Sequence, residues 1–380
     1  MTEGFLLDQG RCTGCSACRL GCTIENGLDW DRSWRRVHTG NPQRLEAGAT
    51  LHLSSACHHC ERAACLDACP ARAIRHDEAS GAVLLDDADC IGCGYCSWAC
   101  PYDAPLFDHA RGVMSKCTSC PERRAGGLAP ACVSACPTGA LEWGELDRGQ
   151  ALEPLLTATR LQPRFRVIPP LGGPGPGDPF QPGAATAPLP AGGPNGAPIT
   201  LRSEWPLAVF TLVAGLLAAW AAAADWMDRR IELLPFGGLA AAATVLAGLH
   251  LGSPRRAWRA VLNPRRSWLS REVLAWNLLV VLGLYSAHRG PADQTAAGAA
   301  ALAGLLTLVC VDGVYRVLRR AGPRGPHSAG AVLSGLVLFA LLARLPALLA
   351  ALVLARASLC APRLPSTRLP VVPARLPPRR

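Results

Sequence analysis

Residues 90–101 read CIGCGYCSWACP, with four cysteines spaced C-x2-C-x2-C-x3-C and a proline directly after the last. Residues 12–22 repeat this spacing without the proline, and residues 57–70 and 117–137 carry looser versions that end in Cys-Pro. These four groups hold 16 of the 18 cysteines of the 380-residue chain. Such regular groups indicate ligands rather than packing residues. The cysteines are Cys12, Cys15, Cys18, Cys22, Cys57, Cys60, Cys65, Cys69, Cys90, Cys93, Cys96, Cys100, Cys117, Cys120, Cys132 and Cys136.

The C-x2-C-x2-C-x3-C-P run is the bacterial ferredoxin pattern for binding a [4Fe–4S] cluster. Three closely spaced thiolates bind three iron corners, and the fourth cysteine of a run ligates the cluster of a partner run. The proline turns the chain, because it cannot continue a helix. Small residues between the ligands, such as Gly14, Ser16, Gly92 and Gly94, let backbone amides approach the cluster sulfurs and so help to set the reduction potential.

Zinc and disulfides are the alternative uses of such cysteines. Zinc sites take four ligands as two C-x2-C pairs, which the second and fourth groups would also satisfy. Disulfides need an oxidising compartment, and Met1–Gly10 has neither the basic run nor the apolar stretch of a signal peptide. His58 and His59 adjoin Cys57 and Cys60. Because every group already has four cysteines, we interpret both histidines as neighbours of the ligands or as surface residues.

Composition divides the chain into two halves. Residues 1–150 carry 14 basic and 19 acidic side chains, a net charge of −5, whereas residues 151–380 carry 24 and 9, a net charge of +15. The positive charge therefore lies outside the cysteine-rich half, and nucleic acid is not indicated as a partner. Residues 169–198 hold 10 Pro and 8 Gly, which is typical of a linker. We predict a cluster domain at 1–150, a Pro/Gly-rich linker at 151–200, a helical domain at 201–355 and a basic tail at 356–380.

The second half contains five long apolar stretches. A membrane-spanning helix needs about 20 mostly apolar residues. Buried helices of a soluble domain are the alternative, but residues 201–355 have too little polar surface to cover so many. We therefore predict an all-α bundle of about five transmembrane helices. The stretches are Trp205–Ala224, Leu233–Gly252, Val273–His288, Gln294–Val311 and Ala329–Ala355, the last of which contains Arg344 and Pro346.

Residues 3–147 resemble the four-cluster iron–sulfur subunit of the dimethyl sulfoxide reductase group of molybdenum enzymes. The segments RCTGCSACRLGCTIEN, CHHCERAACLDACPARAI, CIGCGYCSWACPYDAPLF and KCTSCPERRAGGLAPACVSACPTGAL match it in order and spacing. The resemblance implies an α+β ferredoxin-like fold with four [4Fe–4S] clusters. It also implies that the first group pairs with the fourth and the second with the third. The implied ligand sets are Cys12, Cys15, Cys18 and Cys136; Cys22, Cys117, Cys120 and Cys132; Cys57, Cys60, Cys65 and Cys100; and Cys69, Cys90, Cys93 and Cys96.

The segments SEWPLAVFT, GLHLGSPRRAWRAVLN and SWLSRE, within residues 203–272, are similar to the membrane anchor subunit of the same group, and this resemblance extends over about 203–345. The resemblance implies a metal-free quinol site at the membrane face and carries quinol binding to His250. Histidine suits proton acceptance, since its pKa lies near neutrality. The alternative is that His250 only anchors the helix end. Further quinol candidates are Arg255, Arg256 and Glu272, while Asp312 is either functional or a paired structural charge.

Arginine counts predict the topology. The loops after the second and fourth predicted spans hold ten Arg, whereas the opposite side holds three. The excess of positive charge on cytoplasmic loops places the cluster domain in the cytoplasm. We therefore expect a multi-pass protein of the cell inner membrane. The alternative is that the cluster domain lies on the opposite side of the membrane. The resemblance includes many relatives that are exported together with a catalytic subunit carrying the export signal.

The chain departs from the family in two ways. The family usually keeps the two subunits as separate chains, and its anchor usually has more membrane helices. Residues 356–380 hold six Arg and six Pro with no acidic residue. One hypothesis is a frameshift or truncation that replaced the remaining spans. The other is a short anchor with a basic tail that contacts the anionic membrane surface.

The combined expectation is a non-catalytic electron-transfer and membrane-anchor subunit. Menaquinol or another quinol would donate electrons at the anchor. Four [4Fe–4S] clusters would pass them to a separate molybdopterin-containing catalytic subunit, with membrane lipid and quinone as the other partners. The sequence has no GxGxxG motif and no phosphate-binding loop. One alternative runs the electrons in reverse, from a substrate-oxidising subunit into quinone. Another is a structural zinc-binding membrane adaptor.

Overall fold

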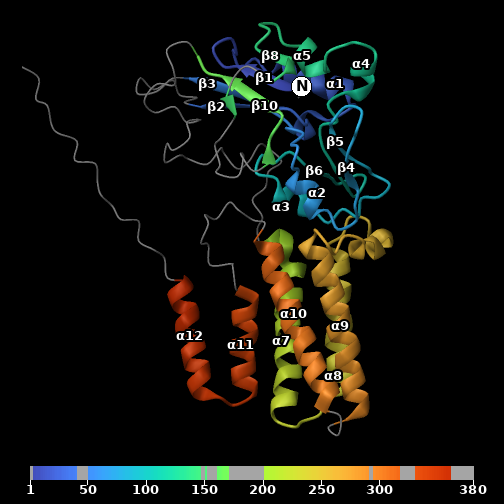
Figure 1. Cartoon of the computed structure of the whole chain (residues 1–380), viewed down its shortest axis with the longest axis vertical. Coiled ribbons are helices and arrows are strands. Elements are labelled where there is room, and N and C mark those ends of the chain that lie inside the picture. The colour runs from blue at the N-terminus through green and yellow to red at the C-terminus, as the bar shows by residue number, and fades with distance from the viewer. Residues whose placement is uncertain are drawn as a thin grey trace, which may run out of the picture.

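A computed structural model shows two parts, a unit of short strands and helices and a bundle of longer helices beneath it (Figure 1). This division confirms the predicted fold class, a cysteine-rich ferredoxin-type unit followed by apolar helices. The structure describes residues 3–40, 50–146, 150–151, 161–170, 201–290, 294–316 and 330–360. Most of the predicted linker and the last twenty residues of the predicted tail therefore lie outside the described residues.

In its described residues, the first unit is built from short elements, none longer than nine residues. Its strands are β1 (Glu3–Asp8), β2 (Arg36–Gly40), β3 (Leu51–Ser55), β4 (Ile74–His76), β5 (Val83–Leu85), β6 (Leu106–Asp108), β7 (Val113–Ser115), β8 (Leu141–Glu145), β9 (Gln150–Ala151) and β10 (Phe165–Ile168). Its helices are α1 (Ala17–Glu25), η1 (Trp30–Arg32), α2 (Ala64–Ala68), α3 (Tyr95–Ala99), α4 (Pro121–Ala125) and α5 (Ala131–Ser134).

One four-stranded sheet, in the order β8-β1-β10-β9, closes the top of this unit. Strand β1 runs antiparallel to β8 and parallel to β10. The alternating residues Phe5, Leu7, Phe165 and Val167 are buried on one face of the sheet. Because β10 is part of this sheet, the first unit extends past the predicted boundary at residue 150. That boundary was wrong, since the strand lies just before the Pro/Gly-rich stretch that suggested a linker.

Three two-stranded hairpins, β2-β3, β4-β5 and β6-β7, connect the cysteine groups. The short helices α2 and α3 end at Ala68 and Ala99, and the next residues, Cys69 and Cys100, have extended backbone angles. The prolines Pro70 and Pro101 explain these ends, because the residue before a proline is pushed out of the helical region. The predicted turning role of these prolines therefore agrees with the observed helix ends.

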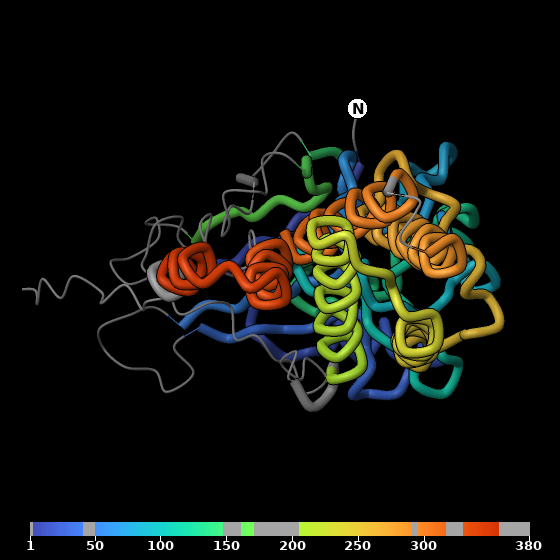
Figure 2. Tube along the Cα trace, turned by 90° about the horizontal axis from the view of Figure 1, so that it is seen from below, coloured from blue at the N-terminus to red at the C-terminus, as the bar shows by residue number. Residues whose placement is uncertain are grey.

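The second part contains six α-helices and one 3-10 helix in the described residues. They are α7 (Leu201–Trp226), α8 (Leu233–Leu249), η2 (Pro254–Val261), α9 (Trp268–Arg289), α10 (Gln294–Tyr315), α11 (Gly330–Leu342) and α12 (Pro346–Cys360). Seen from below, α11 and α12 lie to one side of the group formed by α7 to α10 (Figure 2). Small buried residues such as Ala214, Ala221 and Ala300 line the contacts inside this group and allow close helix packing.

Two of these helices are long and apolar enough to cross a membrane, Trp205–Trp226 and Thr295–Tyr315. A third candidate would combine α8 and η2, although the two are bent by 106°. Helix α9 has 22 residues, but its first turns carry Arg271 and Glu272. Two or three helices of the described part therefore meet the requirement, and the predicted count of about five spans stays a prediction.

The last apolar stretch forms two helices instead of the single predicted span. Helix α11 ends at Leu342 and α12 begins at Pro346. Arg344 between them has a φ of +55°, which breaks the helix, and the proline ring prevents its continuation. The expectation of one span over Ala329–Ala355 was therefore wrong.

Asp312 near the end of α10 has a structural role. Its carboxylate accepts the backbone N–H groups of Ala331 (2.8 Å) and Val332 (3.1 Å), in the first turn of α11. A carboxylate at this position satisfies amides that have no partner within the helix and complements the helix dipole. The structure thus favours the structural alternative for Asp312.

Candidate functional site

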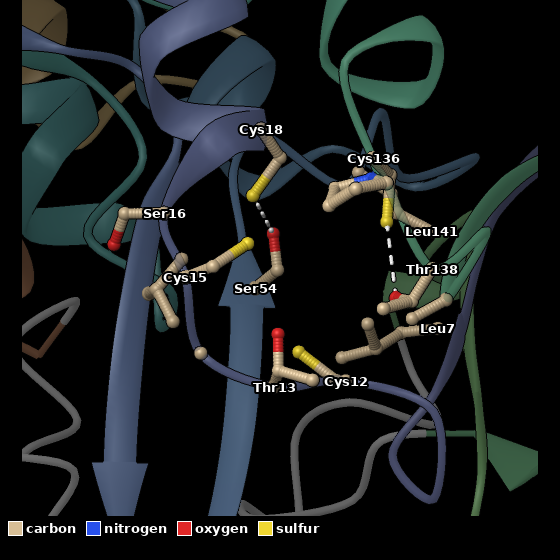
Figure 3. A pocket seen from close by; sticks show the side chains of 14 residues that line it. Leu7, Cys12, Thr13, Cys15, Ser16, Cys18, Ser54, Cys136, Thr138 and Leu141 are labelled. Atoms are coloured by element: carbon tan, nitrogen blue, oxygen red, sulfur yellow. Dashed lines mark hydrogen bonds between the residues drawn. The ribbon is translucent and has the colours of Figure 1, made fainter.

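The cysteines gather in four sets of four, and the first lies at the top of the molecule. This distal set consists of Cys12, Cys15, Cys18 and Cys136. All four line one cavity of about 310 Å³. Their sulfurs face a common space, in which the Sγ atom of Cys18 lies 3.2 Å from the Ser54 hydroxyl (Figure 3). Cys15 is exposed, so this set is open to solvent.

A second cavity of about 370 Å³ is lined by another four cysteines. These cysteines form the third set, counted along the chain of sets from the distal end, and they are Cys57, Cys60, Cys65 and Cys100. Lys116 also lines the cavity, and its Nζ atom lies 3.6 Å from the Cys57 sulfur. The two cavities therefore each bring together cysteines from two separate groups of the sequence.

The proximal set lies at the bottom of the first unit and consists of Cys69, Cys90, Cys93 and Cys96. Electrostatic interactions connect the Cys93 and Cys96 thiols with those of Cys69 and Cys90. The N–H groups of Gly92 and Met114 each donate to the Cys90 sulfur at 3.4 Å. At Gly92, a backbone amide therefore approaches a cysteine sulfur, as predicted from the small residues between the ligands.

The second set consists of Cys22, Cys117, Cys120 and Cys132. The Cys22 thiol interacts electrostatically with those of Cys132 and Cys120. The Ser119 N–H donates to the Cys117 sulfur at 3.4 Å. Ser119 and Cys120 both have positive φ angles, so the chain folds tightly around this sulfur.

The four sets form a row. Neighbouring sets are joined by electrostatic interactions between single thiols. These pairs are Cys18 with Cys132, Cys57 with Cys117, and Cys65 with Cys96. The order is therefore distal, second, third and proximal, from the top of the first unit toward the helices. Each set has the same four members as one of the ligand sets that the resemblance implied, and ligation of clusters by these cysteines stays a prediction.

Burial opposes ionisation of these thiols. It raises the pKa of Cys22 to about 12, that of Cys93 to about 12 and that of Cys100 to about 11. A metal ligand must be a thiolate, so each set needs strong positive charge to form. Within the described part of the chain, no three His, Cys, Asp or Glu side chains are placed to hold one metal ion. A multi-iron cluster fits such sets, since each thiolate binds a different iron atom.

Two buried cations lie among the sets. Arg35 and Lys116 are 1% and 3% exposed. Arg35 interacts with thiols of the distal and second sets, and Lys116 with thiols of the second and third. Neither residue was predicted from the sequence. Lys116 is the single lysine of the chain and adjoins Cys117, which could have drawn attention to it.

His58 and His59 are buried, so the interpretation of surface residues was wrong for both. His58 stacks on Phe165 with ring centroids 4.6 Å apart, and burial lowers its pKa to about 3. His59 accepts the Val83 N–H at its Nδ1 atom, 3.1 Å away. Both rings therefore pack beside the third set as neutral neighbours of its cysteines.

The proximal set rests directly on the helical part. The Asn263 amide donates to the Cys69 carbonyl at 2.9 Å, and the Ser267 hydroxyl donates to the Ala68 carbonyl at 2.7 Å. The Arg256 guanidinium donates to the carbonyl oxygens of Cys90 (3.2 Å) and Asp87 (2.6 Å). These bonds hold the loops that carry the proximal cysteines.

A backbone contact completes this junction. The Gly252 N–H donates to the Gly92 carbonyl at 3.4 Å. A Cβ atom on Gly252 would lie 2.2 Å from the Gly112 oxygen, and one on Gly92, whose φ is +69°, would lie 2.4 Å from the same oxygen. Glycine is therefore required at both places for the two parts to meet.

The predicted quinol residues lie around this junction. His250 is half-buried at the end of α8, two residues before Gly252. Arg255 is exposed, whereas Glu272 is 8% exposed. Arg256 instead donates hydrogen bonds to backbone carbonyls of the first unit. The structure thus places His250 close in the chain to the contact with the proximal set.

Comparisons with known proteins find relatives for the cysteine-rich first unit. Residues 49–146 match the 4Fe-4S dicluster domain family. The chain is 38% identical over 175 residues to a chain of the anaerobic dimethyl sulfoxide reductase of Escherichia coli K12, covering 44% of this protein and 85% of that one. It is 39% identical over 149 residues to the thiosulfate reductase electron transfer subunit of Salmonella typhi, covering 38% and 77%. A tetrathionate reductase subunit of Salmonella typhimurium is 38% identical over 144 residues, covering 37% and 57%.

Proposed function

Because this protein belongs to the family of iron–sulfur electron-transfer subunits found in dimethyl sulfoxide reductases, we propose that its four cysteine sets bind four [4Fe–4S] clusters and carry electrons between the helical part and a separate catalytic subunit. A cluster of this type supplies reversible one-electron transfer when bound. The observation that carries the proposal is the row of four sets, two of which line cavities with all four cysteines.

The protein residues define the two ends of this path. Asn263 and Arg256 hold the backbone of Cys69 and Cys90 against the helices, so the proximal set is the end that faces the anchor. The distal set lies at the opposite end, and its Cys15 is exposed. Helix α1 beside it also exposes Leu20 and Ile24, at 49% and 73%. The distal end is therefore where a molybdopterin-containing catalytic subunit would receive electrons and reduce a small oxidised substrate.

At the other end, His250 is the residue that would accept a proton from menaquinol or another quinol. This residue ends α8, and the chain reaches the proximal loops within two residues, at Gly252. A proton acceptor close to the first electron acceptor lets a quinol release its proton and its electron at one place. Arg255 is exposed beside it and would help to bind the quinol.

The helical part would anchor this subunit in the inner membrane. Helices α7 and α10 have the length and composition of spans, and α8 with η2 is a further candidate. The Arg-rich helix η2 lies at the end of the helical part that faces the first unit. This position supports a cytoplasmic location for the first unit.

A direct test is reduction of the purified full-length chain by a menaquinol analogue under anaerobic conditions. The proposal expects bleaching of the cluster absorbance with quinol and again with dithionite. Bleaching by dithionite alone, in membranes as well as in detergent, would remove the quinol-oxidising role and leave an iron–sulfur protein with another electron donor.

A further inference from the structure

In the part of the first unit that the structure describes, the positive charges of Arg35 and Lys116 are buried without an acidic partner. Arg35 and Lys116 are 1% and 3% exposed. Among the described residues, no carboxylate forms a salt bridge with either side chain. Burying a charge is strongly unfavourable unless an opposite charge compensates it. The compensating negative charge must therefore come from another group.

Arg35 lies between the distal and second sets. One guanidinium nitrogen, Nη1, donates to the Ser54 carbonyl at 3.3 Å and to its hydroxyl at 3.2 Å. The Nε and Nη2 atoms have no hydrogen-bond partner in the part of the chain that the structure describes. The nearby thiols with which the guanidinium interacts are those of Cys132, Cys18, Cys117 and Cys22. The unpartnered N–H groups fit an anion held between these cysteines.

Lys116 lies between the second and third sets. Its ammonium group donates to the Cys117 carbonyl at 3.1 Å, to the Val83 carbonyl, and to the Cys57 sulfur at 3.6 Å. It also lines the cavity of the third set. Carbonyl oxygens solvate the ammonium, but they carry no net negative charge, so the thiolates and whatever they bind must balance it.

We propose that Arg35 and Lys116 raise the reduction potentials of the clusters beside them, Arg35 for the distal and second sets and Lys116 for the second and third. This inference rests on the proposed function, since it needs the clusters. Reduction adds one negative charge to a cluster that four thiolates already make anionic. A fixed cation nearby stabilises the reduced form, and the low dielectric of the interior strengthens the effect.

The proposal assigns a different response to each set. The second set is adjacent to both cations, the distal and third sets to one each, and the proximal set to neither. The proximal set has Arg256 instead, which is half-buried and donates to backbone carbonyls. The two buried cations thus make the middle of the row the preferred place for an electron.

The test is a redox titration of the full-length protein, followed by electron paramagnetic resonance. One Cys→Ser variant in each set assigns its signal. Lys116→Gln should lower the midpoint potentials of the second and third sets, and Arg35→Gln those of the distal and second sets. At a fixed potential, we expect the ratio of reduced to oxidised cluster to fall about tenfold. This fall corresponds to a decrease of about 59 mV in the midpoint potential of a one-electron couple. Lys116→Arg and Arg35→Lys should keep the potentials near those of the wild type.

Arg62 provides a matched control. It lies between Cys60 and Cys65 in the sequence, close to the third set, but is exposed. Arg62→Gln removes the same charge from a solvated position and should leave the third set nearly unchanged. A shift as large as that of Lys116→Gln would overturn the role of burial.

The other outcomes are also decisive. Unchanged potentials in both Gln variants, or equal shifts in all four sets, would overturn the inference while leaving the proposed function standing. Loss of a cluster in Lys116→Gln but not in Lys116→Arg would support a need for the charge. Loss in both would show a role for the lysine's shape instead. Absence of clusters from the wild-type chain would overturn the proposed function, and this inference with it.

Discussion

The proximal and distal cysteine sets have the same number of thiols but opposite surroundings. Around the proximal set, Asn263, Ser267 and Arg256 of the helical part donate to the backbone of the cysteine loops. Around the distal set, Cys15 is exposed and its cavity opens toward solvent. One end of the row is therefore fixed to the same chain, whereas the other is left accessible.

Under the proposed function, this difference separates two tasks. The contact between the first unit and the helical part lies within one chain, so buried hydrogen bonds and the glycines Gly92 and Gly252 can fix its geometry. A contact with a separate catalytic subunit would form between two surfaces, and it would need an accessible cluster. Substitutions at the two ends test whether they differ in this way.

The largest effect should come from removing one ligand at each end. Cys93→Ser should abolish quinol-dependent reduction of the other clusters, because electrons would enter the row through the proximal set, while dithionite still reduces the remaining clusters. Cys15→Ser should leave quinol-dependent reduction of the other three sets intact. Stopped-flow absorbance measures both variants. Equal losses in the two would contradict the assignment of the ends.

A smaller effect is expected at the quinol end. His250→Ala should slow quinol-dependent reduction about 100-fold, because general-base catalysis accelerates a reaction by about 10²–10⁴-fold. Reduction by dithionite should be unchanged. His288→Ala, an exposed histidine at the far end of α9, serves as the control and should retain the wild-type rate. A wild-type rate in His250→Ala would assign the residue to anchoring the helix end.

The hydrogen bonds at the junction should contribute measurable stability. Asn263→Leu leaves the buried Cys69 carbonyl without its donor, which costs about 1–3 kcal/mol. The thermal loss of cluster absorbance in detergent should begin at a lower temperature. Arg265→Gln, at an exposed position two residues further on, should leave the transition unchanged. An unchanged transition in Asn263→Leu would show that the junction does not limit stability.

The smallest difference concerns metal removal. A hydrophilic iron chelator should remove iron from the distal set before it removes iron from the proximal set, since Cys15 is exposed while Cys69, Cys90 and Cys96 are buried. We expect only a modest difference in rate between these two sets. Loss of each signal in electron paramagnetic resonance gives the order. Loss of the proximal signal first would show that the helices do not shield that end.

Much of this architecture could be predicted from local spacing. The closely spaced cysteine groups fix short loops, and the Cys-Pro pairs at Pro70 and Pro101 end the helices where they predict it. The division into a cysteine unit and apolar helices also follows from composition. The sets themselves join groups that are far apart in the sequence, so their membership came from a resemblance and not from spacing alone.

Other features depend on contacts that no local pattern contains. Strand β10 pairs with β1 across most of the first unit, and so the boundary at residue 150 was placed too early. Arg35 is buried by residues from several segments, and its sequence neighbours do not distinguish it from a surface arginine. The break at Arg344 depends on a backbone angle that hydropathy does not report.

The proposed function depends above all on four clusters per chain, so the decisive measurement is iron, zinc and acid-labile sulfide analysis of the ⁵⁷Fe-enriched full-length chain, with Mössbauer spectroscopy to identify the type of cluster. We expect about 16 iron atoms per chain, with about 16 acid-labile sulfides and all iron in [4Fe–4S] clusters. About 8 iron atoms per chain, or zinc in place of iron, would contradict it.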